Sequence, residues 1–301
     1  MKFTTMKSQE DSVVEKMLLS NPVVWNCLRP KPQTHFKKIM HYLSISSIFK
    51  NENHHLQEWL DYHLQVGVEH FYLYNNDDNP TESDAILRPY IERGFAHNIH
   101  ISGQRMQVPQ MRSAMCAFKH SSRWLAFIDL DEFILPRACD DIKEILEDYE
   151  LYSALAIHWT VFGSGDLLRR PPNQIDHYLY RAKLEHPINC HVKCIMNPAL
   201  AIPEAHWHPH WTRYYEGHAV NEKYQHVPEW HDEYTGEIIR LNHYCCRSRQ
   251  DWDEIKQPRP RCDTGALYDE ERWLEVNLND IYDDEISRRF GGRKEQSGEV
   301  T

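Results

Sequence analysis

Two carboxylates stand two residues apart in the segment Ile128-Asp129-Leu130-Asp131-Glu132-Phe133, near the middle of an apolar run over residues 124–135. In an extended chain, residues two apart point to the same side, so Asp129 and Asp131 are expected to share one face of a strand. Two such carboxylates repel each other unless a cation lies between them. A hard divalent ion, Mn²⁺ or Mg²⁺, suits oxygen ligands of this kind and can bridge to a diphosphate leaving group.

Two more polar segments follow strand-like runs. Residues 41–49 and 68–74 read as strands, and they are followed by Lys50–Glu52 and Asn75–Asp78. Helical patterns over 54–67, 82–93 and 108–121 alternate with these strands and with further strands at 95–101 and 124–135. Such alternation predicts an α/β, Rossmann-like, mostly parallel sheet with helices on both faces. Ligands of such sheets bind beyond the carboxyl ends of the strands, where all three polar segments fall.

The second half of the chain has a different pattern. Strands are expected at 153–162, 191–196 and 237–246, and helices at 140–149, about 249–256 and 268–276, which predicts mixed strands. We expect an N-terminal extension over 1–40, with a short helix at 11–19, and one catalytic domain over 41–285. That domain divides into 41–136 and 137–285, and a disordered tail is expected over 286–301.

Composition excludes several classes of protein. The net charge is −11, and an acidic chain is a poor partner for long nucleic acid, although it can bind a diphosphate where a metal ion supplies positive charge. The eight cysteines are irregularly spaced and lack a CxxC pair, so we expect thiols in a reducing compartment. No apolar run approaches the ~20 residues of a membrane span, and the charged N-terminus lacks a signal-peptide pattern. We therefore expect a soluble, cytoplasmic chain, and the oligomeric state stays open.

Several segments carry a family resemblance. KNENHHLQEWLDYHLQVGVEHFYLYNN, WLAFIDLDEFILP, HWTVFGSGD, HVKCIMNP and LNHYCCRSRQDW occur in this order between about residues 42 and 256. This pattern resembles glycosyltransferase family 92 and the broader GT-2-like group. The resemblance implies a GT-A fold, a nucleotide-sugar donor (often UDP-galactose), and inverting, Mn²⁺-assisted transfer of a hexose to a glycan or another hydroxyl acceptor. Lys50 replaces the arginine with which the first segment usually begins. The positive charge stays, but the planar guanidinium, which can donate two parallel hydrogen bonds, is lost.

The resemblance also suggests roles for individual residues. It implies that Asp129 and Asp131 hold the metal and the donor, with His243 as the third metal ligand. Lys193 would neutralise the leaving diphosphate. Further donor contacts are expected from Asn51, Glu52, Asn76, Asp77, Gln110, Arg112 and Glu132. Plain alternatives stay open: a turn for Asn75–Asp78, an ion pair for Arg112, a sheet-edge salt bridge for Glu132 and a packed imidazole for His243.

Inverting transfer needs a general base for the acceptor hydroxyl. Asp166, in the flexible loop Phe162-Gly163-Ser164-Gly165-Asp166, is the candidate base, with Glu204 and Asp232 as alternatives. The segment His206–Trp211 is expected to be an aromatic acceptor region or a loop. Two other functions also fit the paired carboxylates or the aromatic residues. One is a metal-dependent phosphotransferase or nucleotidyltransferase, and the other is a non-catalytic carbohydrate-binding protein.

Overall fold

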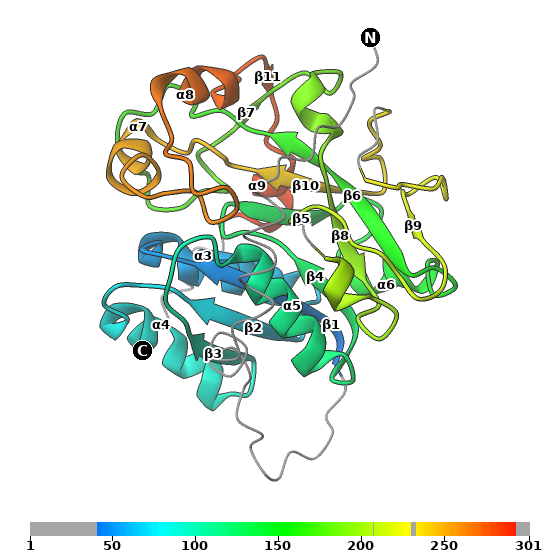
Figure 1. The fold of residues 1–301 in the computed structure, drawn as a ribbon. Helices are drawn as coiled ribbons and strands as arrows, with labels where there is room; N and C mark the ends of the chain where they lie inside the picture. Colours follow the sequence, from blue (N-terminus) through cyan, green and yellow to red (C-terminus); the bar gives the residue numbers. More distant parts are fainter. Residues whose placement is uncertain (1–40, 207, 230–232, 293–301) are drawn as a thin grey trace, which may run out of the picture. The chain divides into compact units, whose positions relative to one another are not determined.

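A central sheet organises the part of the chain that the computed structural model describes, which is residues 41–206, 208–229 and 233–292. Its strand order is β3-β2-β1-β4-β8-β6-β10-β5, with β9 paired to β6 (Figure 1). The strands are β1 His41–Phe49, β2 His70–Asn75, β3 Ala96–His100, β4 Ser122–Phe127, β5 Glu132–Pro136, β6 Ala154–Val161, β8 Val192–Met196, β9 Ala219–Val220 and β10 Ile239–His243. Two short strands, β7 Tyr180–Arg181 and β11 Ile281–Tyr282, pair separately.

The first half is a parallel α/β unit. Strand β1 pairs in parallel with β2 and β4, and β2 pairs in parallel with β3. The connecting helices are α3 Asn53–Gln65, α4 Thr81–Glu92 and α5 Gln107–Phe118. Neighbouring residues of β2 point to opposite faces. Phe71 joins the core cluster of Trp59 from α3, while Tyr72 joins that of Met111 from α5. Helices therefore cover both faces, as predicted.

The second half is mixed. Strand β8 runs antiparallel to β4 and β6, and β10 runs parallel to β6 but antiparallel to β5. Its helices are α6 Ile142–Glu147, α7 Arg249–Asp251, the π-helical turn η3 Trp252–Lys256, α8 Glu270–Val276 and α9 Glu285–Phe290, with 3₁₀ turns η1 Pro187–Cys190 and η2 Pro203–Ala205. The predicted α/β class, with a mostly parallel sheet and mixed strands in the second half, is confirmed.

The predicted single strand over residues 124–135 is wrong, because the chain turns at residues 128–131. Strand β4 ends at Phe127 and β5 begins at Glu132. The backbone N–H of Asp129 donates to Glu132 Oε2 at 2.8 Å, and the N–H of Glu132 donates to the carbonyl of Asp129 at 3.0 Å. These bonds close a turn. Asp129 and Asp131 therefore do not share a strand face, and β5 leaves to pair with β10.

The boundary predicted for the tail also needs correction. Residues 286–290 belong to helix α9, where Ile286 is 1% and Phe290 7% exposed. These two side chains pack into the main core cluster, so this part of the predicted tail is ordered. Residues 293–301 lie outside the described structure. So do residues 1–40, with the helix expected at 11–19, and Asp232.

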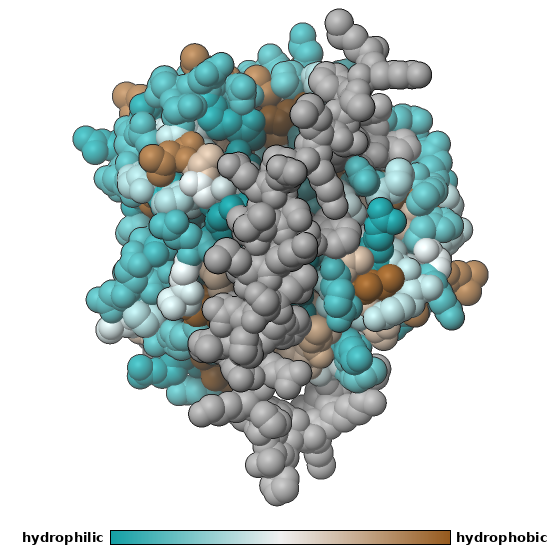
Figure 2. All heavy atoms as spheres, in the orientation of Figure 1, coloured by the Kyte–Doolittle hydropathy of each residue, from teal (hydrophilic) through white to brown (hydrophobic). Residues whose placement is uncertain are grey.

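The apolar residues gather in the interior. Figure 2 shows that hydrophilic residues dominate the described part of the visible face, and that hydrophobic residues occur there in small, separate groups. Among the cysteines that the structure describes, Cys139, Cys194, Cys245, Cys246 and Cys262 are free thiols, as their spacing suggested. None of the described helices combines the length and the apolar character that a bilayer crossing requires.

Candidate active site

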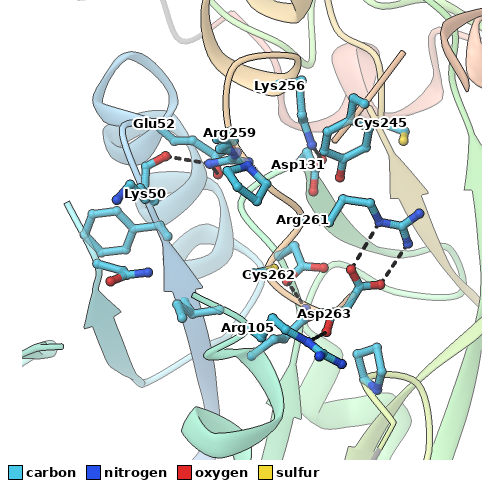
Figure 3. Close-up of a pocket in the computed structure, with 18 of the residues that line it drawn as sticks. Lys50, Glu52, Arg105, Asp131, Cys245, Lys256, Arg259, Arg261, Cys262 and Asp263 are labelled. Carbon is cyan, nitrogen blue, oxygen red and sulfur yellow. Dashed lines mark hydrogen bonds and ion pairs between the residues drawn. The ribbon is translucent and has the colours of Figure 1, made fainter. Parts of the chain in front are cut away.

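A pocket lies at the carboxyl ends of the parallel strands. Its lining includes Phe49 at the end of β1, Asn76 after β2, Asp129 and Asp131 after β4, and His243 at the end of β10. The opposite wall comes from a distant segment, residues 256–263, and from Tyr268 and Arg272 (Figure 3). Ends of separate strands therefore deliver polar side chains to one cavity, as expected of a sheet of this kind.

Asp129 is held by two neighbours at one side of the pocket. Its Oδ1 accepts a hydrogen bond from Gln107 Nε2 at 2.9 Å, and its Oδ2 lies 3.0 Å from the Nζ of Lys193. Burial opposes the charge on Lys193, but Asp129 and Glu132 outweigh it and raise the pKa of Lys193. Lys193 is thus a permanent buried cation that faces the pocket beside the first carboxylate.

Asp131 lies deeper and has two cationic neighbours. The ammonium of Lys256 contacts its Oδ2, and His243 Nε2 lies 3.6 Å from the same oxygen. Burial favours the neutral acid, but Lys256 and His243 prevail and hold the pKa of Asp131 well below its ordinary value. Burial likewise opposes protonation of His243, yet Cys245 and Asp131 raise its pKa to about 10. Asp131 therefore carries its charge inside the protein because cations surround it.

The side chains around Asp131 fit a divalent ion whose coordination shell is completed by substrate and water. Within the described residues, no three His, Cys, Asp or Glu side chains form a metal-holding group, and Asp129 is turned to Gln107 and Lys193. Magnesium-type sites, however, use one or two carboxylates and complete the shell with substrate phosphates and water. The Asp131 carboxylate and a neutral His243 imidazole would suit such an ion once the Lys256 ammonium leaves Asp131 and His243 gives up its proton. The described arrangement thus matches a substrate-completed site better than a three-ligand protein cage.

Glu132 supports the turn from behind the pocket. It is fully buried and does not line the cavity. Its Oε1 accepts a hydrogen bond from Trp159 Nε1 at 2.7 Å, and its Oε2 lies 3.4 Å from the Nζ of Lys193. Burial raises the pKa of Glu132 despite the nearby lysine. This geometry matches the alternative of a sheet-edge salt bridge rather than a direct donor contact.

Of the donor contacts predicted in the segments Lys50–Glu52 and Asn75–Asp78, one residue in each segment lines the pocket. Glu52 is 4% exposed, lines the pocket and pairs with Arg247 at 2.7 Å and Arg259 at 2.8 Å. Asn76 also lines the pocket, and its Nδ2 donates to the carbonyl of Gly103 at 3.0 Å. Asn51 and Asp77 do not line it; the Asn51 N–H donates to the Asp77 carboxylate. For Asp77, the alternative of a residue that stabilises a turn therefore fits better than a donor contact.

Four further predicted residues lie outside the pocket lining. Gln110 is buried and donates to Ser46 Oγ at 2.6 Å, and Arg112 Nε donates to the carbonyl of His206 at 2.6 Å. The two base candidates, Asp166 and Glu204, are exposed. The structure does not bring these side chains to the cavity.

The segment 256–263 is the part of the site that sequence reasoning missed. Arg259 and Asp263 line the pocket from it, and the Cys262 carbonyl accepts a hydrogen bond from the backbone N–H of Gln107 at 3.2 Å. Its sequence, KQPRPRCD, alternates basic residues with prolines in an otherwise acidic chain. That local excess of basic residues is the signal that could have identified it.

Comparison with known proteins places the chain in a family. Residues 40–275 match the model of glycosyltransferase family 92. The chain belongs to this family. A family 92 protein of Ricinus communis is 25% identical over 224 residues, which cover 68% of this chain and 35% of the relative. A galactan beta-1,4-galactosyltransferase of Arabidopsis thaliana is 27% identical over 37% of this chain and 24% of that protein. The chain thus spans only 24% to 35% of the length of these two relatives.

Among solved structures, S. aureus TarS 1-349 resembles this family 92 chain with a TM-score of 0.38 and 12% identity. The similarity covers 78% of this chain and 69% of that one.

Proposed function

We propose that this family 92 chain transfers a hexose, with galactose as the first candidate, from a UDP-sugar to a hydroxyl of a glycan or another acceptor, with inversion. Two findings support this: membership of the family, and a pocket that joins Asp131, His243 and buried lysines at the strand ends. The pocket carries the proposal because it combines one carboxylate and one imidazole that could hold a metal ion with lysines that suit a diphosphate. Galactose is suggested by one relative, a galactan beta-1,4-galactosyltransferase.

The proposed reaction depends on stabilising the negative charge of the leaving diphosphate. The acceptor oxygen forms a bond to the anomeric carbon, the bond from that carbon to the diphosphate oxygen breaks, and the diphosphate departs with the electron pair. Negative charge grows on the leaving group, and preorganised cations stabilise it. Lys193 and Lys256 line the cavity as buried cations, and both are held in place by carboxylates. An Mn²⁺ or Mg²⁺ ion bound by Asp131 and His243 would supply further charge compensation when present.

The acceptor proton needs a base within the pocket. Among the described residues, Asp263 is the carboxylate from the second half, residues 137–285, that lines the cavity. Arg261 pairs with it at 2.8 Å, and although burial opposes ionisation, this arginine lowers the pKa of Asp263. We therefore propose Asp263, in place of Asp166 or Glu204, as the group that receives the proton. We also retain the proposed division into a donor half, 41–136, and an acceptor half, 137–285, with residues 256–263 contributing to both.

The alternatives predict different products. A nucleotidyltransferase would consume a nucleoside triphosphate and a sugar phosphate and release pyrophosphate, whereas a glycosyltransferase releases a nucleoside diphosphate. A non-catalytic carbohydrate-binding protein would bind sugar without nucleotide. The paired carboxylates and buried lysines of the pocket favour chemistry at a diphosphate over simple sugar binding.

A donor screen tests the proposal. The full chain is incubated with UDP-galactose, UDP-glucose or GDP-mannose, with Mn²⁺ and a panel of glycan acceptors, and release of the nucleoside diphosphate is measured. Release from a UDP-sugar, with a β-linked product in the proton NMR spectrum, supports inverting transfer. If no donor yields a diphosphate, and pyrophosphate appears from UTP with a sugar phosphate, the nucleotidyltransferase alternative replaces the proposal.

A further inference from the structure

The pocket is electropositive although the chain is acidic. Seven lysine and arginine side chains and four carboxylates line it, whereas the whole chain has a net charge of −11. Each of the four carboxylates already has a lysine or arginine partner: Glu52 with Arg259, Asp129 with Lys193, Asp131 with Lys256 and Asp263 with Arg261. Of the three remaining cations, Lys50 pairs with Asp78 and Arg272 with Glu275, both outside the lining, which leaves Arg105.

Lys256 occupies a distinctive place in this lining. It ends the π-helical turn η3, a kind of turn that often occurs at functional sites, and its residue is 4% exposed. Its ammonium contacts Asp131 and lies 5.9 Å from the ring centre of Tyr268. Because Lys256 compensates Asp131, this carboxylate need not repel an incoming anion when no metal ion is present.

Two arginines extend the cationic wall. The Arg261 guanidinium lies 5.8 Å from the centre of the same Tyr268 ring, so this ring positions both cations. Arg105 lines the opposite side and approaches the same segment, with its Nε 3.4 Å from the carbonyl of Asp263 (Figure 3). Among the described residues no carboxylate pairs with Arg105, so its charge is available to a ligand.

We infer that Arg105 and Lys256, here named the anion clamp, bind the diphosphate of the donor directly, so that a nucleoside diphosphate binds without a divalent ion. The inference rests on the proposed function, because it concerns the same pocket. Guanidinium groups suit phosphate oxygens, since two parallel N–H groups can meet two oxygens. Diphosphate affinity is thereby built into the chain, and a metal ion adds to it rather than creating it.

Calorimetric titration of the full chain tests this inference. UDP, inorganic pyrophosphate and uridine are titrated in EDTA, and UDP is titrated again in Mn²⁺. The variants are Arg105→Gln, which breaks no carboxylate pair, and Lys256→Met. The control is Lys223→Met, because Lys223 is an exposed lysine outside the pocket that pairs with Glu233. Circular dichroism confirms that each variant is folded.

We expect UDP and pyrophosphate, but not uridine, to bind in EDTA, with affinity that falls as salt rises. Arg105→Gln should weaken UDP in EDTA about 10-fold, the loss expected for one charge-assisted hydrogen bond. Lys256→Met should weaken it by at least as much, and Lys223→Met should leave it unchanged. Binding of UDP only in Mn²⁺ would overturn the clamp while the proposed transfer stands. Absence of binding in both conditions would overturn both, and equal losses in Lys223→Met and Arg105→Gln would reduce the clamp to a general charge effect.

Discussion

Asp283 holds the C-terminal segment to the sheet through a buried ion pair. Its carboxylate accepts hydrogen bonds from both terminal nitrogens of Arg240 at 2.9 Å, and from Arg181 Nε at 2.7 Å. The Arg240 side chain is 3% exposed and lies on β10, the strand that ends at His243. In Asp283→Asn the buried guanidinium loses both hydrogen bonds to Asp283 and, within the described part of the chain, keeps only Glu285, at 3.9 Å, as a counter-charge. Breaking such a pair costs about 3–5 kcal/mol. At about 2–4 °C for each kcal/mol, the melting temperature should fall by about 6–20 °C.

The neighbouring residue supplies a matched control. Asp284 pairs with Arg288 at 2.8 Å, but the Arg288 side chain is 66% exposed. An exposed pair of this kind contributes about 0–1 kcal/mol. Urea unfolding of wild type, Asp283→Asn and Asp284→Asn at pH 7, followed by circular dichroism, gives the two free-energy differences. If Asp283→Asn loses no more stability than Asp284→Asn, the assignment of a buried, stabilising ion pair to Asp283 is refuted.

The pH dependence of the same difference provides a second check. Burial raises the pKa of Asp283, but Arg240 and Arg181 outweigh it and lower this pKa below its ordinary value of 3.8. A folded-state pKa below the unfolded one means that the stabilisation is fully present above the unfolded value and disappears as pH falls through the folded value. The difference between wild type and Asp283→Asn should therefore be constant from pH 7 to about 5 and shrink below about 4. An undiminished difference at pH 3 would contradict this reasoning.

Three predictions concern activity and are read as release of UDP from the UDP-sugar that the screen identifies. Asp131→Asn should slow release at least about 100-fold, because Asp131 would hold the divalent ion and holds the Lys256 ammonium in place, and these positive charges stabilise the leaving group. Asp263→Asn should lower kcat about 100-fold and change KM less than about threefold, as for loss of a general base; a change in KM alone would argue against that role. Asp166→Asn and Glu204→Gln should retain activity within about twofold, because both residues lie outside the pocket lining.

The elements of the parallel half could be predicted because their signals are local. The helix expected over 54–67 is α3, Asn53–Gln65, and the strand expected over 41–49 is β1. Amphipathic periodicity and β-branched runs depend on neighbouring residues alone. The pocket followed from topology, since carboxyl ends of parallel strands meet at one edge. Glu52, Asn76 and Asp129 line the cavity for that reason, whereas Lys193 reaches it from the start of the antiparallel strand β8.

Side-chain direction was less predictable. Gln110 and Arg112 were expected to face the donor from the start of a helix, yet Gln107 is the residue that contacts Asp129 and lines the pocket. Helix α5 begins at Gln107, and each residue carries the chain about 1.5 Å farther along the axis. By position 110 the side chain meets Ser46, in the middle of strand β1. Gln107 and Gln110 are only three residues apart at the start of the helix, yet Gln107 lines the pocket and Gln110 is buried outside the lining.

Net charge proved a poor guide to the site. From a net charge of −11, the positive charge needed for a diphosphate was assigned to a metal ion. The chain instead brings seven cations of its own to the pocket, several of them from residues 256–261, over a hundred positions from Asp131. At physiological salt, exposed charges are screened over about 8 Å, so acidic residues on the remote surface act weakly on a ligand in the cavity. Lys256 and Arg261 line the cavity itself, where such screening is small. We therefore expect anion binding to depend on local charge, which is set by which distant segments fold together.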